Sequence, residues 1–345
     1  MLTQFAAKHN LPKFRERQFN EAFYRQGITS FAGLSTWPKD LRAKLEAEVP
    51  FSSLECEIEL VSKNKDTHKV LFKRKIDGQR IEAVLMKHKD GRNTVCVSCM
   101  VGCPVNCSFC ATGKMGFGGN LSADEILDQI LHFQRKLVMR GENVSNVVFM
   151  GMGEPMLNLA EVERAIAAIT DTDKLALGKR RLTISTSGYV PQFRKLIADG
   201  FRGRVAISLH APNQELREKL MPVAKIFSLE QLLAVLDEYT ALTNKRVSYE
   251  YVMIKNVSDK DGHAKQLVKL FKHRLAHVNL IPYNPIREAD FGRSARAQVD
   301  RFRQILQRGG VETTVRVTMG DDVNAACGQL ADRENRKNIK RKISI

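Results

Sequence analysis

The chain has 345 residues, which is room for one large domain and one or two small ones, so a short peptide module is excluded. Hydrophobic residues make up 43% of the chain and charged residues 27%, values that exclude a disordered protein and allow a sizeable core. Lys and Arg number 55 against 38 for Asp and Glu. The resulting net charge of +17 favours a polyanionic partner, and nucleic acid more than a membrane.

Neither a membrane anchor nor a secretion signal is visible in the sequence. No apolar run approaches the ~18 residues of a spanning helix, and residues 1–17 are broken by polar side chains. We therefore expect a cytoplasmic protein that is not bound to a membrane. Five of the seven cysteines fall between Cys96 and Cys110, and such clustering in a reducing compartment favours metal or redox chemistry over disulfides.

Residues 1–52 are expected to form a basic helical N-terminal module, because charged amphipathic patterns cover 15–25 and 38–48. Residues 53–88 follow as a β-hairpin and linker element. Apolar and acidic residues alternate from Leu54 to Leu60, which predicts a half-buried strand with Cys56 on its apolar face and Glu59 on the other.

Residues 89–330 are expected to form an α/β core that ends in a loop around Cys327. Apolar β-rich runs alternate there with amphipathic helical stretches, and Ser122 with Glu125 forms the capping box of one such helix. About six βα units predict a parallel sheet, open or curled into a barrel, with ligands at the C-terminal ends of its strands. The predicted strands are 144–150, 182–186, 205–210, 247–254, 278–282 and 313–317. Residues 331–345 are expected to be a basic, solvated tail.

Cys103, Cys107 and Cys110 have the spacing C-x3-C-x2-C, which can wrap three thiolates around one metal centre. Iron-sulfur clusters are held by cysteine thiolates, and three ligands for a four-iron cluster leave one iron open for a substrate or cofactor. The alternative is a structural zinc site completed by Cys99, because zinc prefers four closed ligands.

Beyond the cysteine spacing, the chain resembles a known family along most of its length. Cys103-x3-Cys107-Ser-Phe-Cys110 is similar to the cluster motif of the radical S-adenosylmethionine (SAM) superfamily. The remaining motifs resemble the RlmN family of dual-specificity RNA methyltransferases and follow the order of that family. The matching stretches are 78–82, 96–110, 151–155, 185–188, 208–210, 279–285 and 320–330.

The resemblance implies a partial (β/α)6 barrel that holds one [4Fe-4S] cluster on Cys103, Cys107 and Cys110 and uses two SAM molecules per turnover. It implies methylation of adenosine C2 in 23S rRNA, at the peptidyl-transferase centre, and in tRNA, next to the anticodon. A flavodoxin or ferredoxin is the implied electron donor, and the enzyme is expected to be a monomer. The implied SAM-binding residues are Gly153, Glu154, Ser185, Ser208, Leu209, His210 and Asn284.

Adenine C2 is electron-poor and cannot attack the methyl group of SAM as an amine would, so a radical route is needed. The resemblance implies that Cys327 takes a methyl group from one SAM, and that a second SAM yields the radical that activates it. The carbon then bonds to C2, and Cys96 releases the product by attacking Cys327, which leaves a transient disulfide. Glu82 is the implied acid-base residue.

Two alternatives stay open at this point. Cfr-type enzymes, which confer antibiotic resistance, resemble the chain throughout but methylate adenine C8, whereas Pro155, Ser187 and Pro282 favour the C2 branch. An alternative of another class is a zinc-ribbon RNA-binding protein without catalysis, which leaves residues 151–155 unexplained. Cys99 stands where the family usually has Ser, and we interpret it as an inert replacement.

Overall fold

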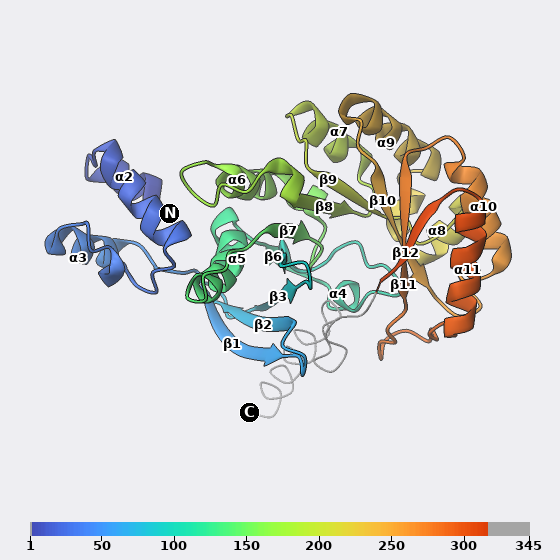
Figure 1. Cartoon of the computed structure of the whole chain (residues 1–345), viewed down its shortest axis with the longest axis horizontal. Helices are drawn as coiled ribbons and strands as arrows, with labels where there is room; N and C mark the ends of the chain where they lie inside the picture. The colour runs from blue at the N-terminus through green and yellow to red at the C-terminus, as the bar shows by residue number, and fades with distance from the viewer. Residues whose placement is uncertain (1, 317–345) are drawn as a thin grey trace.

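The computed structural model describes residues 2–316, whose arrangement is shown in Figure 1. One mixed sheet of 10 strands runs through this part of the chain in the order β1-β2-β3-β4-β7-β8-β9-β10-β11-β12, and β5 pairs with β6 beside it. The strands are β1 (Leu54–Val61), β2 (Thr67–Arg74), β3 (Arg80–Lys87), β4 (Asn93–Cys96), β5 (Met100–Gly102), β6 (Phe117–Asn120), β7 (Asn146–Phe149), β8 (Leu182–Thr186), β9 (Arg204–Ser208), β10 (Val247–Met253), β11 (Ala276–Pro282) and β12 (Glu312–Val315).

The sheet changes character at β4. β1 to β4 pair antiparallel, whereas β4, β7, β8, β9, β10, β11 and β12 pair parallel in that order. All six predicted strands of the core are present as β7 to β12, and β4 is the parallel strand that the sequence did not reveal. Among residues 2–316 no strand pairs with the outer edge of β1 or of β12, so the sheet stays open as a partial barrel.

Helices connect the parallel strands and, in Figure 1, line the outer side of the curved sheet. Parallel neighbours require such crossovers, because a tight turn cannot join them. The helices of the core are α4 (Ala111–Lys114), α5 (Ala123–Val138), α6 (Leu159–Thr170), α7 (Val190–Ala198), α8 (Gln214–Leu220), α9 (Leu229–Thr243), α10 (Asp261–Phe271) and α11 (Arg296–Arg308), with short 3-10 turns η3 (Pro155–Asn158), η4 (Lys179–Arg181) and η5 (Pro222–Lys225).

Helix α5 follows its sequence pattern closely. Ser122 caps it as predicted, since its Oγ accepts the N–H of Glu125 at 3.2 Å and the Glu125 carboxylate accepts the N–H of Ser122 at 2.8 Å. The apolar face of this amphipathic helix, with Ile126, Ile130 and Phe133, is completely buried against the sheet. Local capping and apolar spacing are therefore sufficient to define this helix.

The N-terminal module consists of α1 (Leu2–Lys8), α2 (Lys13–Asn20), a π-helical turn η1 (Glu21–Arg25), a 3-10 turn η2 (Phe31–Gly33) and α3 (Lys39–Glu48). It has a small core of its own, built around Phe19, Phe31 and Trp37. Arg25 donates from Nε to the carbonyl oxygen of Lys174 at 2.8 Å, which ties the module to the loop after α6. Some of the basic charge of the module is thus used to hold it in place.

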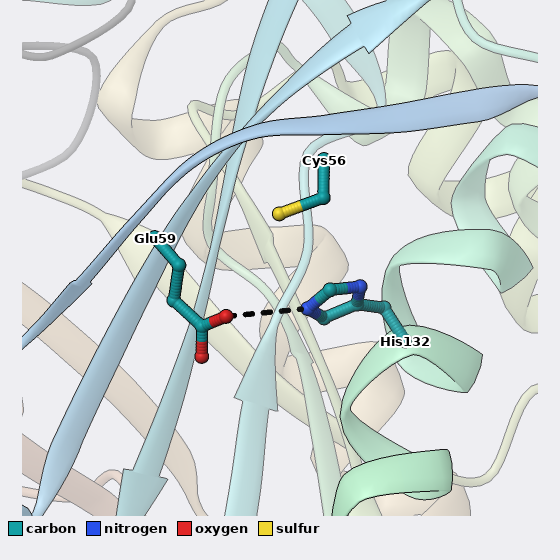
Figure 2. A group of neighbouring side chains, drawn as sticks. All are labelled: Cys56, Glu59 and His132. Atoms are coloured by element: carbon teal, nitrogen blue, oxygen red, sulfur yellow. Dashed lines mark ion pairs between the residues drawn. The ribbon is translucent and has the colours of Figure 1, made fainter.

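Strand β1 departs from its predicted alternation. The register with β2 shifts between Cys56 and Ile58, so a β-bulge reverses the faces of the residues that follow. Cys56 keeps the face of Leu54, opposite the buried Phe72, although it is itself exposed. The prediction that Glu59 lies on the other face is wrong, because the bulge turns it to the side of Cys56. The bulge places Cys56 and Glu59 on the same side, opposite His132 of α5, as Figure 2 shows.

None of the helices formed by residues 2–316 combines the length and the apolar character that crossing a lipid bilayer would require.

Candidate active site

The three cysteines of the C-x3-C-x2-C motif lie on the loop between β5 and α4. Gly102 begins this loop at φ +66°, and a Cβ there would stand 1.8 Å from the carbonyl oxygen of Gly116. The neighbouring Cys103 N–H donates to that same carbonyl oxygen at 2.8 Å, which closes the loop at its base. Farther along, the N–H of Ser108 donates to the carbonyl oxygen of Leu220 at 2.9 Å and fixes the loop to the end of α8.

The environment of these thiols suits metal coordination. Burial, together with the charges of its neighbours, raises the pKa of Cys103 to about 12 and that of Cys107 well above its ordinary value. Cys103 and Cys110 are among the groups that act on Cys107, so the three thiols lie within electrostatic reach of one another. A thiol in such a place loses its proton outright when it coordinates a metal cation.

Within residues 2–316, one set of three Cys, His, Asp or Glu side chains has all its ligand atoms within 4.8 Å of one another, and that set is Cys56, Glu59 and His132. The Cys56 set itself is an ionic contact between β1 and α5. Glu59 lies 4.0 Å from Nε2 of His132, the pair joined by the dashed line in Figure 2, and it also contacts Lys136 and His68. Burial lowers the pKa of His132 to about 4, so the imidazole is neutral near pH 7. Because Lys136 already neutralises Glu59, we assign this group to the packing of the hairpin on the core.

The loop 151–155 directly follows β7 and carries one buried carboxylate. Gly153 has φ +103°, and a Cβ there would stand 2.6 Å from Cβ of Met100, so only glycine fits. Glu154 is 3% exposed, and one of its oxygens accepts both the N–H and the Oγ–H of Ser187 at 2.7 Å. Burial raises the pKa of Glu154, and the hydrogen bonds from Ser187 oppose this effect.

The other predicted SAM-binding residues lie at the same edge of the sheet. Ser185 is near the end of β8, Ser208 ends β9 and Asn284 follows β11 by two residues. Leu209 is fully buried, and the N–H groups of Leu209 and His210 both donate to the carbonyl oxygen of Glu250 at 3.1 Å. The C-terminal ends of parallel strands are where α/β sheets bind ligands, so the placement of these residues is consistent with one pocket.

His210 is held in one protonation state. Burial lowers its pKa to about 3, and its Nδ1 accepts the N–H of Val252 at 3.1 Å. A neutral ring whose Nδ1 accepts a hydrogen bond carries its proton on Nε2. Its ring also packs edge to face on Phe109 of the cysteine loop, with centroids 4.8 Å apart. His210 therefore links the end of β9 to the predicted cluster loop.

Arg217 is a residue of this region that the sequence did not single out. It is fully buried on α8, donates from Nη2 to the carbonyl oxygen of Ser187 at 2.5 Å, and has no hydrogen-bond partner for Nε or Nη1 among the described residues. Cys107 is the charge that favours its protonated form. A buried guanidinium with unpartnered N–H groups fits an anionic neighbour, such as thiolates holding a cluster or the carboxylate of SAM.

Glu82 and Cys96 lie on one face of the antiparallel part of the sheet. Val84 of β3 is opposite Cys96 of β4, and Glu82 is two residues from Val84, so its side chain shares the face of Cys96. Glu82 is 3% exposed and its carboxylate is 2.9 Å from Nζ of Lys69. Lys69, Glu82 and Cys96 thus come from three neighbouring strands, β2, β3 and β4.

Ser98 joins this group to the loop 151–155. Its Oγ donates to the backbone carbonyl oxygen of Glu82 at 2.6 Å and accepts the N–H of Met152 at 2.9 Å. The amide of Gln129 on α5 accepts the N–H of Ser98 at 2.8 Å and donates to its carbonyl oxygen at 3.0 Å. The backbone around Glu82 is therefore connected rigidly to the predicted SAM loop.

Cys99 differs from the motif cysteines in its surroundings. Cys99 is 2% exposed and belongs to the main apolar core, whereas Cys103 and Cys107 pack against a different apolar group around Val105 and Leu220. Cys327 and the tail 331–345 lie outside the described residues.

Comparisons with known proteins give the same assignment from sequence and from structure. A family model for the radical SAM superfamily matches residues 97–268. The chain is 44% identical over 331 residues to a probable dual-specificity RNA methyltransferase RlmN of Symbiobacterium thermophilum, an alignment that covers 96% of this chain and 88% of that protein. A probable RlmN of Clostridium tetani is 40% identical, with 98% and 95% covered. The crystal structure of a radical SAM methyltransferase from Sphaerobacter thermophilus is 41% identical and superposes with a TM-score of 0.91, covering 95% of this chain and 96% of that one.

The fold and the cysteine loop thus define a radical SAM enzyme. Within this class, the relatives share one activity, methylation, and one kind of polymer as substrate, RNA. The chain belongs to the RlmN family of dual-specificity RNA methyltransferases. The predicted fold class and enzyme class are confirmed, and the Cfr-type and zinc-ribbon alternatives are not supported. Membership implies a [4Fe-4S] cluster, SAM and an RNA substrate.

Proposed function

We propose that this enzyme methylates C2 of adenosine in 23S rRNA and in tRNA, with Cys327 carrying the methyl carbon and Cys96 releasing the product. Relatives at 40% and 44% identity are probable dual-specificity RNA methyltransferases, which supports the choice of two RNA substrates. The observation that carries the proposal is the shared face of Glu82 and Cys96 beside the loop 151–155. An acid-base group and a resolving thiol are two of the three groups that this chemistry requires of the protein, and the third is the thiol that carries the methyl carbon.

The proposed cofactor site follows from the residues around the cysteine loop. Cys103, Cys107 and Cys110 hold one [4Fe-4S] cluster with an open iron, and two SAM molecules are used per turnover. When bound, the cluster and SAM supply the methyl group and the one-electron chemistry of the reaction. A flavodoxin or ferredoxin delivers the electron, and the enzyme acts as a monomer. SAM is bound by Gly153, Glu154, Ser185, Ser208, Leu209, His210 and Asn284.

Glu82 acts as the base in this proposal. The product carries a methyl group where C2 carried hydrogen, so a base must accept the C2 proton after the new carbon-carbon bond has formed. Glu82 is a buried carboxylate whose charge is balanced by Lys69 at 2.9 Å. The target base has to leave its stack to reach such a buried group.

Cys96 acts as the nucleophile that ends the reaction. Its thiolate attacks Sγ of Cys327 while the sulfur still carries the carbon bonded to adenine. The sulfur-carbon bond breaks, the carbon keeps the electron pair and takes up a proton to become the methyl group, and a Cys96–Cys327 disulfide forms. A reductant then restores both thiols for the next turnover.

The position of the new methyl group is the direct test. Enzyme loaded with iron and sulfide is incubated anaerobically with SAM, a reductant and either a 23S rRNA fragment or a tRNA. Digested RNA is then compared by chromatography and mass spectrometry with 2-methyladenosine and 8-methyladenosine standards, and Cys110→Ala serves as the control. We expect 2-methyladenosine on both RNAs. An 8-methyl product would contradict the proposal.

A further inference from the structure

Lys69 is a buried cation beside the proposed base. It lies on β2, its side chain is 0% exposed, and its Nζ is 2.9 Å from the Glu82 carboxylate, which is itself 3% exposed. An ammonium group so deeply buried cannot contact RNA phosphates from this position. Its role must therefore be sought inside the protein.

The sheet register places this pair next to Cys96. Lys69 is opposite Val84 of β3, and Val84 is opposite Cys96 of β4, so Lys69, Val84 and Cys96 form one row across three strands. Glu82 follows Val84 by two residues on the same face. The ammonium thus reaches diagonally across β3 to the carboxylate, which is a usual distance for long side chains in an antiparallel sheet.

Burial and pairing have opposite effects on a carboxylate. Removal from water favours the protonated acid, whereas an opposite charge within about 4–6 Å favours the ionised form by about 1–3 pH units. Arg316, which follows β12, is a further cation on this face, since Arg316, Lys69 and Glu82 all act on the Cys96 thiol. Lys69 contacts the Glu82 carboxylate directly at 2.9 Å.

We propose that Lys69 is a positioning residue, which holds the Glu82 carboxylate by direct contact and points it along the shared face of β2, β3 and β4 so that it can accept the C2 proton. This inference rests on the proposed role of Glu82 as the base. In the step concerned, the C2–H bond breaks, the proton moves to a Glu82 oxygen, and the unpaired electron of the adduct passes to the one-electron carrier of the proposed cofactor site, which restores the aromatic ring. Lys69 neither gains nor loses an atom in this step.

The test compares two buried ion pairs on the same strand. Lys69→Met removes the proposed positioning cation, and Arg74→Met removes a second buried cation of β2, which contacts Glu125 at 2.6 Å. Both variants should lose thermal stability, because each leaves a buried carboxylate without its partner. Methylation rates are measured in single turnovers from acid to alkaline pH, alongside RNA affinity and iron content.

The methylation rate is expected to decline toward acidic pH. In Lys69→Met, we expect this decline to occur at a pH about 1–3 units higher than in the wild type, with RNA affinity and iron content unchanged. Lys69→Arg should restore the wild-type profile, since it retains the charge. Arg74→Met should lose thermal stability but keep the wild-type dependence of the methylation rate on pH. If Lys69→Met does not fold, Lys69→Gln replaces it and is expected to show the same shift, because it too removes the charge.

A wild-type pH profile in the neutral Lys69 variant, or an equal shift in Arg74→Met, would overturn the inference. Glu82→Gln separates this outcome from failure of the proposed function. If Glu82→Gln methylates RNA at the wild-type rate, Glu82 is not the base and the proposed function fails at that point. If Glu82→Gln is inactive while the neutral Lys69 variant keeps the wild-type profile, only the role of Lys69 is wrong.

Discussion

At the scale of single residues, Cys96 is a weak nucleophile in the state described. Burial raises the pKa of its thiol to about 11, although Arg316 and Lys69 both act in the opposite direction. The thiolate, not the thiol, attacks sulfur, so only a small fraction of Cys96 is reactive near pH 7. Slow attack by Cys96 would keep the RNA covalently attached to Cys327 until the chemistry at C2 is complete.

The first prediction concerns the pH dependence of this step. Because the pKa of Cys96 is raised to about 11, the thiolate fraction rises about tenfold for each pH unit below that value. We expect the wild-type protein–RNA adduct to decay correspondingly faster between pH 7 and pH 9. Rapid-quench samples on denaturing gels measure the decay. A rate that does not change with pH would show that thiolate formation does not limit release.

The second prediction concerns Cys99. It lies in the main core, apart from the apolar group that packs around Cys103 and Cys107, so Cys99→Ser should leave iron content unchanged and methylation within a few-fold of wild type. Stability should fall by about 1–3 kcal/mol, because a hydroxyl replaces a thiol at a site that is 2% exposed. Iron analysis and thermal unfolding measure both effects. Loss of iron would instead identify Cys99 as a ligand.

The sequence could predict residues that act through local spacing and could not predict those that act through strand register. Cys103, Cys107 and Cys110 are close in the chain, so their shared function is visible in the motif. Lys69 meets Glu82 only because β2 and β3 pair in one particular register. Arg217 is likewise one of many arginines in the sequence, and only its complete burial beside the cysteine loop marks it out.

At the scale of elements, the loop 151–155 depends on a backbone conformation at Gly153 that residues with a side chain rarely adopt. The third prediction is that Gly153→Ala lowers the affinity for SAM at least tenfold, because a Cβ would stand 2.6 Å from Met100 at φ +103°. Gly262→Ala in α10 is the control, since a Cβ there meets nothing within 4 Å. Equilibrium dialysis of cluster-loaded enzyme measures both. Equal SAM affinities in the two variants would show that the loop 151–155 is not part of the SAM site.

The elements that the sequence predicted well are those with a long periodic pattern. Ser122, Glu125 and the apolar face of α5 define that helix locally. β4 was not predicted because it has only 4 residues and no alternation of burial. The bulge at Cys56 was not predicted because a strict alternation gives no local sign of an inserted residue.

At the scale of the whole molecule, we expect the net charge of +17 to be the main source of affinity for RNA. Part of that charge is internal, since Lys69 and Arg217 are fully buried and Arg25 ties the N-terminal module to the core. Phosphate contacts therefore depend on the exposed Lys and Arg side chains. We expect these contacts to fix the position of the RNA and the buried site to select the base.

The fourth prediction is a steep dependence of RNA binding on salt. Each neutralised phosphate releases counterions. In a plot of the logarithm of the RNA binding constant against the logarithm of the salt concentration, each such phosphate steepens the fall by about 0.7 for a single strand and about 0.9 for duplex DNA. Fluorescence anisotropy with labelled tRNA at several salt concentrations measures that slope, and SAM affinity over the same range is the control. An RNA affinity that is independent of salt would contradict the electrostatic account.

The division of labour between Cys327 and Cys96 is the central claim, and one experiment tests it most directly. Wild-type enzyme, Cys96→Ala, Cys327→Ala and the double variant are each incubated anaerobically with SAM, reductant and RNA, and covalent adducts are measured on denaturing gels and mapped by peptide mass spectrometry. We predict that RNA accumulates on Cys327 in Cys96→Ala, because no thiol remains to attack the bridging sulfur, and that both variants lacking Cys327 form no adduct. RNA trapped by Cys327→Ala, or attached to Cys96 in the wild-type enzyme, would contradict the account.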